Sequence, residues 1–167
     1  MEILIRKSIL FIVLLLAQVL FFNKIHLFHY GTPLLMVYFI MQMPLGQTRW
    51  SLLAVSFLMG ILVDIFSNIP GVTAASLTII GFIQPYLLQM FVSKDDFIQV
   101  TPSIRDFGIE VYSKYAITII SIFVALFFTF ESFNLAGFGD WLLRVIVSIV
   151  ITFIIVIIFE QFRGKRG

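Results

Sequence analysis

The sequence contains no cysteine, and charged residues are rare in it. Without cysteine the chain can form no disulfide, no thiolate nucleophile and no cysteine metal site. Only 12% of its 167 residues are charged, whereas soluble domains usually carry roughly 25%. This shortage of charge excludes an ordinary water-soluble domain.

Apolar residues take the place of the missing charge. Hydrophobic residues make up 60% of the chain, which includes 20 phenylalanines, and the mean hydropathy is +1.09. A chain this short cannot bury so much aromatic surface within itself, so lipid is the expected solvent. The net charge of +2 comes from basic residues at the ends of apolar runs. That placement indicates membrane topology rather than a nucleic-acid partner.

Six apolar stretches are candidates for membrane spans, since a helix needs about 20 residues to cross a bilayer. They are continuously apolar and lack the alternation typical of membrane β-strands. A cleaved signal peptide is the alternative for the first stretch, but no pair of small residues follows Phe22. We therefore predict one all-α integral membrane domain, a compact bundle of six transmembrane helices. The predicted spans are 5–22, 32–45, 50–66, 72–92, 111–130 and 141–159.

The distribution of lysine and arginine predicts the orientation of the bundle. With the N-terminus inside, only Lys24 and Arg144 fall in outer segments. Nine basic residues then lie on the cytoplasmic side, namely Arg6, Lys7, Arg49, Lys94, Arg105, Lys114, Arg163, Lys165 and Arg166. This bias follows the positive-inside rule. Both termini are therefore expected in the cytoplasm.

Prolines and short polar stretches indicate how the spans begin and end. The second span is the shortest, with Pro33 near its start and Pro44 expected to kink or end it. The third and fourth spans are separated only by the turn-forming residues 67–71, which predicts an antiparallel hairpin. The fifth helix is expected to start before its membrane part, with Thr101 as N-cap and Pro102 as the first helical residue.

Asp64, near the outer end of the third span, is the residue whose placement in a bilayer costs the most free energy. A carboxylate at mid-membrane costs about 2.5–3.5 kcal/mol, and less near the interface. Gly60 lies one helical turn before it and allows another backbone to approach. Asp64 is then either a ligand, proton or partner site, or a structural acceptor that ties the Asn68–Gly71 turn to its helix, or a solvated interfacial acid.

Small and amide side chains in the spans suggest where helices pack closely. Ala74, Thr78 and Gly81 form a helix-packing stripe on the fourth span, for contacts within the chain or with a partner. Gln84 is expected to satisfy the backbone carbonyl freed by Pro85. The in-membrane amides Gln18 and Gln42 are expected to hydrogen-bond between helices.

The sequence contains no convincing catalytic, cofactor or metal site. His26 and His29 have no acidic neighbour to complete a metal site. No Ser/His/Asp set and no phosphate-binding glycine loop is present in the sequence. An intramembrane enzyme or ion carrier would place more ionisable groups at mid-membrane. We therefore expect a protein that is not an enzyme.

Residues 45–86 resemble the bacterial rod shape-determining protein MreD family. The resemblance rests on Gly60 and Asp64 at the end of one helix, a short turn through Asn68 and Pro70, and Gly71 at the start of the next helix. The stretches that carry it are 43–44, the basic turn around Arg49, 57–67, 70–74 and 81–83. The length, the six-span layout and the basic ends also fit the family.

The resemblance implies a function in cell shape. Proteins of this family are membrane subunits of the cell-elongation complex in the bacterial cytoplasmic membrane. They look like partners of MreC, a single-span protein, and of other membrane proteins of that complex, and they help link MreB filaments to peptidoglycan synthesis. The family fold is similar to the S component of energy-coupling-factor transporters. A vitamin-binding S component is therefore the alternative function.

Overall fold

The computed structural model describes residues 2–22, 32–44, 46–91, 102–132 and 138–164. Every regular element in these ranges is a helix, which confirms the all-α prediction. The helices are α1 (Glu2–Ala17), α2 (Met36–Met41), α3 (Arg49–Ser67), α4 (Val72–Phe91), α5 (Ile104–Glu131) and α6 (Phe138–Gly164). A π-helical turn, η1 (Gln18–Phe22), continues α1.

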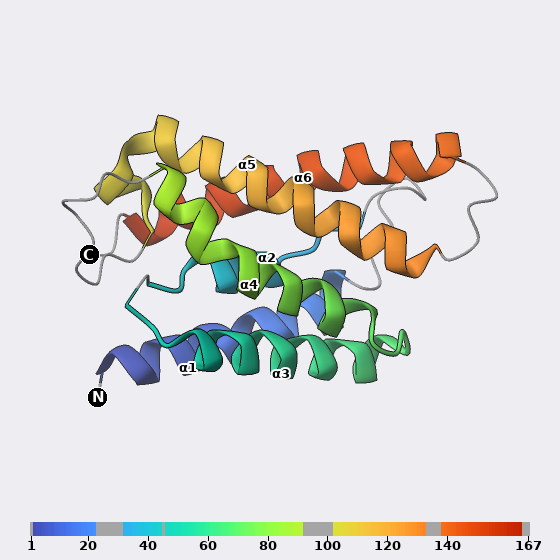
Figure 1. Cartoon of the computed structure of the whole chain (residues 1–167), viewed down its shortest axis with the longest axis horizontal. Helices are drawn as coiled ribbons and strands as arrows, with labels where there is room; N and C mark the ends of the chain where they lie inside the picture. The colour runs from blue at the N-terminus through green and yellow to red at the C-terminus, as the bar shows by residue number, and fades with distance from the viewer. Residues whose placement is uncertain (1, 23–31, 45, 92–101, 133–137, 165–167) are drawn as a thin grey trace.

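Successive elements run back and forth along the long axis of the molecule, and α6 ends at the same end of the molecule where α1 begins (Figure 1). Four helices are long and apolar enough to cross a membrane, namely α3, α4, α5 and residues Gly139–Phe162 of α6. A shorter apolar stretch, Ile9–Leu20, lies at the end of α1 and the start of η1. The chain therefore has the composition and helix lengths of a membrane protein.

The predicted bounds of α3 and α4 agree closely with the structure, and α5 starts before its predicted membrane part, as expected. Its first helical residue is Ile104 and not Pro102, and the predicted N-cap Thr101 lies outside the described residues. Ser103 is the N-cap, because its side-chain oxygen accepts a hydrogen bond from the backbone N–H of Asp106. Gly108, with φ +75°, then interrupts the helix after its first turn. A side chain would strain this conformation, so glycine suits the position.

The prediction of a membrane-length helix over 32–45 is also wrong in extent. Only the six residues of α2 are helical, although the residues on either side of α2 are also buried. Pro33 lacks an N–H and cannot donate a helical hydrogen bond inside the stretch. Side chains from other helices bind the remaining backbone groups, as described below. We call residues 32–43 the α2 segment.

The α2 segment occupies the middle of the bundle, where α2 contacts α1, α3, α4 and α5 (Figure 1). The side chains of α2 are no more than 3% exposed. Large side chains of the surrounding helices complete the core, including Met59, Leu77, Tyr112, Tyr115 and Phe123. The interior of the described part is therefore filled by protein.

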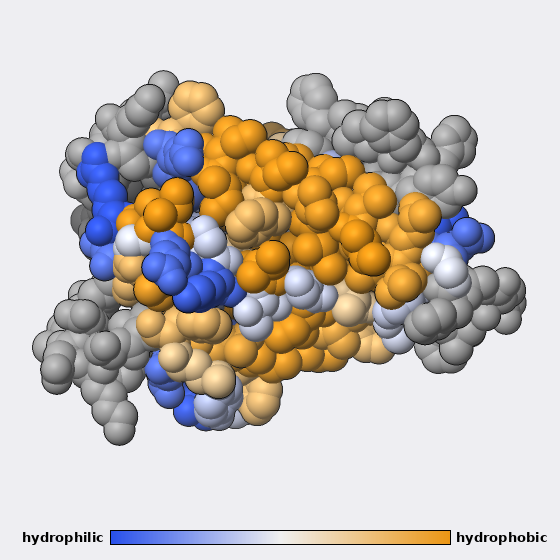
Figure 2. Space-filling view, turned by 90° about the horizontal axis from the view of Figure 1, so that it is seen from above, coloured by the Kyte–Doolittle hydropathy of each residue, from blue (hydrophilic) through white to orange (hydrophobic). Residues whose placement is uncertain are grey.

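The outer surface of the bundle is largely apolar. Figure 2 shows apolar side chains over the middle of one face, with hydrophilic residues mainly toward its ends. On α6, Ile146, Val150 and Ile154 are each about half exposed, at 53%, 51% and 51%. A surface of this kind is stable in hydrocarbon and unfavourable in water.

Candidate functional site

Asp64 joins the two helices of the α3–α4 hairpin. Its carboxylate accepts a hydrogen bond from the backbone N–H of Thr73 at 2.9 Å and another from that of Ala74 at 3.0 Å. These two N–H groups lie in the first turn of α4, where a helix offers no internal acceptor. Asp64 is 5% exposed, so it caps α4 from within the hairpin. Asp64 is therefore a structural acceptor, although its side chain binds the start of α4 and not the Asn68–Gly71 turn that the sequence suggested.

Two glycines allow the hairpin helices to approach closely. A Cβ atom on Gly60 would lie 2.3 Å from the Cα atom of Ala74, and one on Gly81 would lie 2.5 Å from the Oγ atom of Ser56. Gly60, Ala74 and Gly81 are buried, whereas Thr78 is half-buried. The predicted packing stripe on α4 therefore packs against α3 through Ala74 and Gly81.

The turn between α3 and α4 uses residues suited to left-handed backbone conformations. Asn68 has φ 56° and Gly71 has φ 82°. The backbone N–H of Ile69 also donates to the carbonyl oxygen of Asp64 at 3.3 Å. The structure thus brings the predicted site residues Gly60, Asp64, Asn68, Pro70 and Gly71 together at one end of the hairpin.

Two adjoining hollows lie on the exposed surface of this hairpin. The first, of about 320 Å³, is lined by Ile61, Asp64, Ile65, Asn68, Pro70 and Gly71. The second, of about 470 Å³, is lined by Phe57, Ile61, Gly71, Ala74, Ala75, Thr78 and Ile79. They share Ile61 and Gly71, and we call them together the hairpin groove.

Polar side chains of η1 and α6 bind the start of the α2 segment. Gln18 donates to the carbonyl oxygen of Pro33 at 3.0 Å and accepts from the N–H of Leu35 at 2.9 Å. On α6, the hydroxyl of Ser148 accepts from the N–H of Thr32, and that of Thr152 from the N–H of Leu34, both at 3.1 Å. The three N–H groups precede the first helical residue of α2 and have no acceptor within that helix, so side chains of other elements satisfy them.

Other helices bind the far end of the α2 segment. Glu160 on α6 accepts hydrogen bonds at 2.7 Å from the Tyr38 hydroxyl and from the Gln42 amide. Gln84 on α4 donates to the carbonyl oxygen of Met43 at 3.1 Å and to the Tyr115 hydroxyl at 3.2 Å. The interhelical roles predicted for Gln18 and Gln42 are confirmed. Gln84 binds Met43 instead of the carbonyl freed by Pro85.

Sequence reasoning missed the contribution of α6. Ser148, Thr152 and Glu160 are separated by four and eight residues, so they lie on one face of the helix, and all three are buried. The predicted span ended at Phe159, which placed Glu160 at the membrane boundary. The four-residue spacing of polar side chains in an otherwise apolar run was the signal that could have revealed this face.

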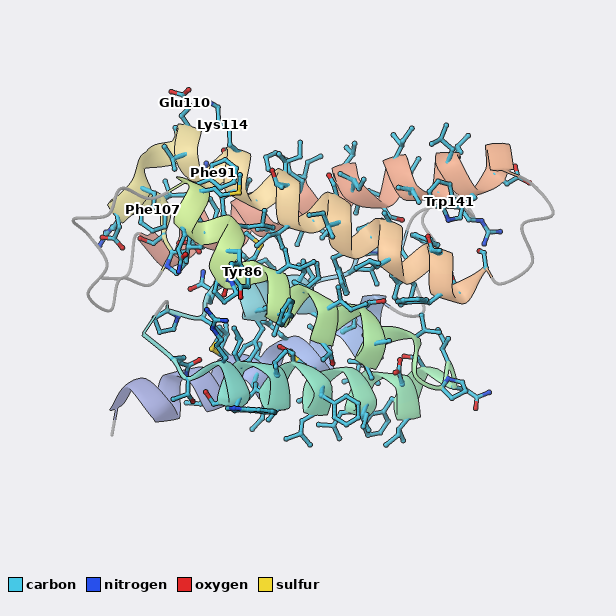
Figure 3. The ribbon with its side chains drawn as sticks, in the orientation of Figure 1. Tyr86, Phe91, Phe107, Glu110, Lys114 and Trp141 are labelled. Atoms are coloured by element: carbon cyan, nitrogen blue, oxygen red, sulfur yellow. The ribbon has the colours of Figure 1, made fainter. Side chains whose placement is uncertain are left out.

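Polar and aromatic residues lie toward the ends of the bundle. The Arg49 guanidinium lies 5.1 Å from the Tyr86 ring centre, and its Nη1 donates to the Tyr86 hydroxyl at 2.7 Å. Figure 3 shows Glu110 and Lys114, which form a 2.7 Å ion pair, at one end and Trp141 toward the other. Such residues are typical of a membrane–water interface.

The described residues contain no group of three or more His, Asp or Glu side chains placed to hold a metal ion. His26 and His29 lie outside the described residues. Comparison of the chain with protein-family models, with curated proteins and with solved structures gave no match.

Proposed function

We propose that this chain is a non-enzymatic membrane subunit of the bacterial cell-elongation complex, resembling the MreD family. In this proposal it lies in the cytoplasmic membrane, binds an MreC-type single-span partner and helps link cytoskeletal filaments to peptidoglycan synthesis. Its mechanism is helix packing in lipid, which depends on close contact and a few polar bonds.

The observation that carries the proposal is the way the residues of the resemblance cooperate. Gly60 makes room for Ala74, Asp64 caps α4, and Gly71 adopts a left-handed backbone conformation. Each residue of the Gly-x-x-x-Asp pattern and the following glycine therefore has a separate task in building one hairpin. This gives a physical reason for their spacing, which generic membrane helices do not need.

The arrangement of the helices supports a six-pass topology with both termini in the cytoplasm. In chain order, α1, the α2 segment, α3, α4, α5 and α6 run in alternating directions (Figure 1). In this topology the α2 segment is one of the passes, and it crosses inside the bundle. Its irregular backbone is acceptable at membrane depth because surrounding protein satisfies it. The basic residues of the sequence favour the same orientation.

The vitamin-binding alternative is less well supported, although the proposed fold resembles that of an S component. A vitamin site needs a concave pocket with several converging polar groups. In the described part of the chain, the α2 segment fills the centre of the bundle. Glu160, the buried carboxylate beside the α2 segment, already accepts two hydrogen bonds from groups of the chain itself. Packing against a partner is therefore the better supported function.

Co-purification and depletion test the proposal together. The full chain, tagged and expressed in its own host, is extracted in mild detergent with a tagged MreC-type protein from the same host. We expect the two proteins to co-elute, and cells depleted of the chain to become round. Rod-shaped cells after depletion, no co-elution, or tight binding of a vitamin to the purified chain would each contradict the proposal.

A further inference from the structure

The hairpin groove is an open, mostly apolar depression on the protein surface with one polar end. Phe57, Thr78 and Ile79 belong to its apolar part, and Asp64 and Asn68 lie at the end nearest the turn. On α3 the lining residues extend from Phe57 to Asn68, which corresponds to about 17 Å of helix. The groove is therefore about three helical turns long.

The groove contains small residues at the spacing of helix contacts. Gly71 and Ala75 are four residues apart, Thr78 follows three residues later, and Ala75 is exposed. In membranes, small residues at such spacings allow the backbone of a second helix to approach. Phe57, Ile61 and Ile79 are the large side chains of this part of the groove.

The polar end of the groove is only partly satisfied by the hairpin itself. An ionised carboxylate has about four acceptor positions, and the printed bonds to Asp64 use one on each oxygen, from Thr73 and Ala74. Asp64 nevertheless lines the first hollow, together with the exposed residue Asn68. A lipid acyl chain complements the apolar part of the groove but has no hydrogen-bond donor for its polar end.

We propose that the hairpin groove receives a transmembrane helix of another chain, and that this helix places a hydrogen-bond donor opposite Asp64 and Asn68. The inference rests on the proposed function and specifies its contact surface. The negative charge and acceptor capacity of Asp64 complement a donor side chain, while the small residues accommodate the partner's backbone.

Matched tryptophan substitutions test the groove. Ala75→Trp fills the groove, whereas Ile154→Trp enlarges a half-exposed side chain on α6, away from it. Each variant of the full chain is co-expressed with the tagged MreC-type partner, and its melting temperature in detergent is compared with that of the wild type. We expect Ala75→Trp to reduce the co-purified partner at least tenfold and Ile154→Trp to reduce it less than twofold, with both variants folded.

If the wild type captures the partner and a folded Ala75→Trp variant captures it equally well, the groove is not the binding site. The proposed function would remain intact. Failure of the wild type to capture the partner would instead count against the proposed function. A photo-crosslinking residue at position 75 identifies the occupant without requiring a disruptive variant. We expect an adduct with the partner's membrane helix, and an adduct only with lipid or with a second copy of the chain would overturn the proposal.

The donor is tested on the partner's side of the contact. Every donor side chain in the outer third of the partner's helix is replaced by leucine, and capture by the wild-type chain is measured. We expect at least a tenfold loss. Unchanged capture would overturn the assignment of a donor opposite Asp64.

Discussion

The α3–α4 hairpin and the α2 segment are both held by buried polar bonds, but those bonds join residues at very different separations along the chain. Asp64 finds its partners 9 and 10 residues away. The backbone and side chains of the α2 segment find theirs on α6 at separations of 116 to 122 residues. The hairpin is thus built locally, whereas the α2 segment depends on the assembled bundle. We therefore expect single substitutions to reduce the stability of the fold most when they fall in the hairpin.

The largest effect is expected for Gly60→Leu. Even a Cβ atom at this position would lie 2.3 Å from backbone of α4, so the two helices must separate. Overpacking typically costs about 1–3 kcal/mol, and a backbone contact this close should exceed that range. We expect little folded protein on size-exclusion chromatography. Gly139→Ala is the control, because a Cβ atom there meets nothing within 4 Å, and its normal yield is part of the prediction.

Asp64→Leu should have the next largest effect. Two backbone N–H groups would lose their acceptor in a buried position, which costs roughly 2–6 kcal/mol in total. Asp64→Asn should cost less, because its amide retains one acceptor oxygen. The measurement is the melting temperature in detergent, with exposed Asp140→Asn as the control. Equal melting temperatures for Asp64→Leu and the wild type would contradict the capping role.

Glu160→Leu tests the α2 segment in the same way. It leaves the Tyr38 hydroxyl and the Gln42 amide without this acceptor, at a cost of roughly 2 kcal/mol. We expect less damage than from Asp64→Leu, because side chains can rotate toward other partners and backbone N–H groups cannot. Glu160→Gln, which retains an acceptor oxygen, should melt close to the wild type. If Glu160→Leu proved more damaging than Asp64→Leu, the comparison between the two regions would be reversed.

The smallest effect is expected for Thr152→Val, which removes one acceptor from the N–H of Leu34. We expect a loss of about 1 kcal/mol, together with faster hydrogen exchange at Leu34. Thr129→Val is the matched control, because that exposed hydroxyl bonds only its own helix, at the carbonyl of Ala125. Equal exchange rates at Leu34 in the two variants would show that Thr152 does not protect this group.

The hairpin could be predicted from the sequence because its determinants lie close together. Gly60, Asp64 and Gly71 fall within twelve consecutive positions, and the turn between the helices is short. Helical spacing alone therefore places Gly60 and Asp64 on one face, and the short turn brings α4 against it. The sequence left open whether Asp64 serves the chain or a partner, because that depends on which N–H groups approach it.

The α2 segment could not be predicted because its apolar pattern resembles that of a spanning helix. Hydropathy reports burial from water, and it does not distinguish lipid from protein as the apolar surroundings. Pro33 and Pro44 indicated an interruption, but the acceptors that permit it, Ser148 and Thr152, lie on the last helix. Their role became visible only when α6 was placed against the segment.

The hydrogen bond between Leu34 and Thr152 also sets how late in synthesis the α2 segment can reach its final structure. Ribosomes add about 5–20 residues per second, so the 118 residues that separate the two take roughly 6–24 s to synthesise. During that time the N–H of Leu34 needs another partner, since hydrocarbon offers none. The α2 segment must therefore wait in a hydrated or assisted state, and emergence of the final helix completes the interior of the protein.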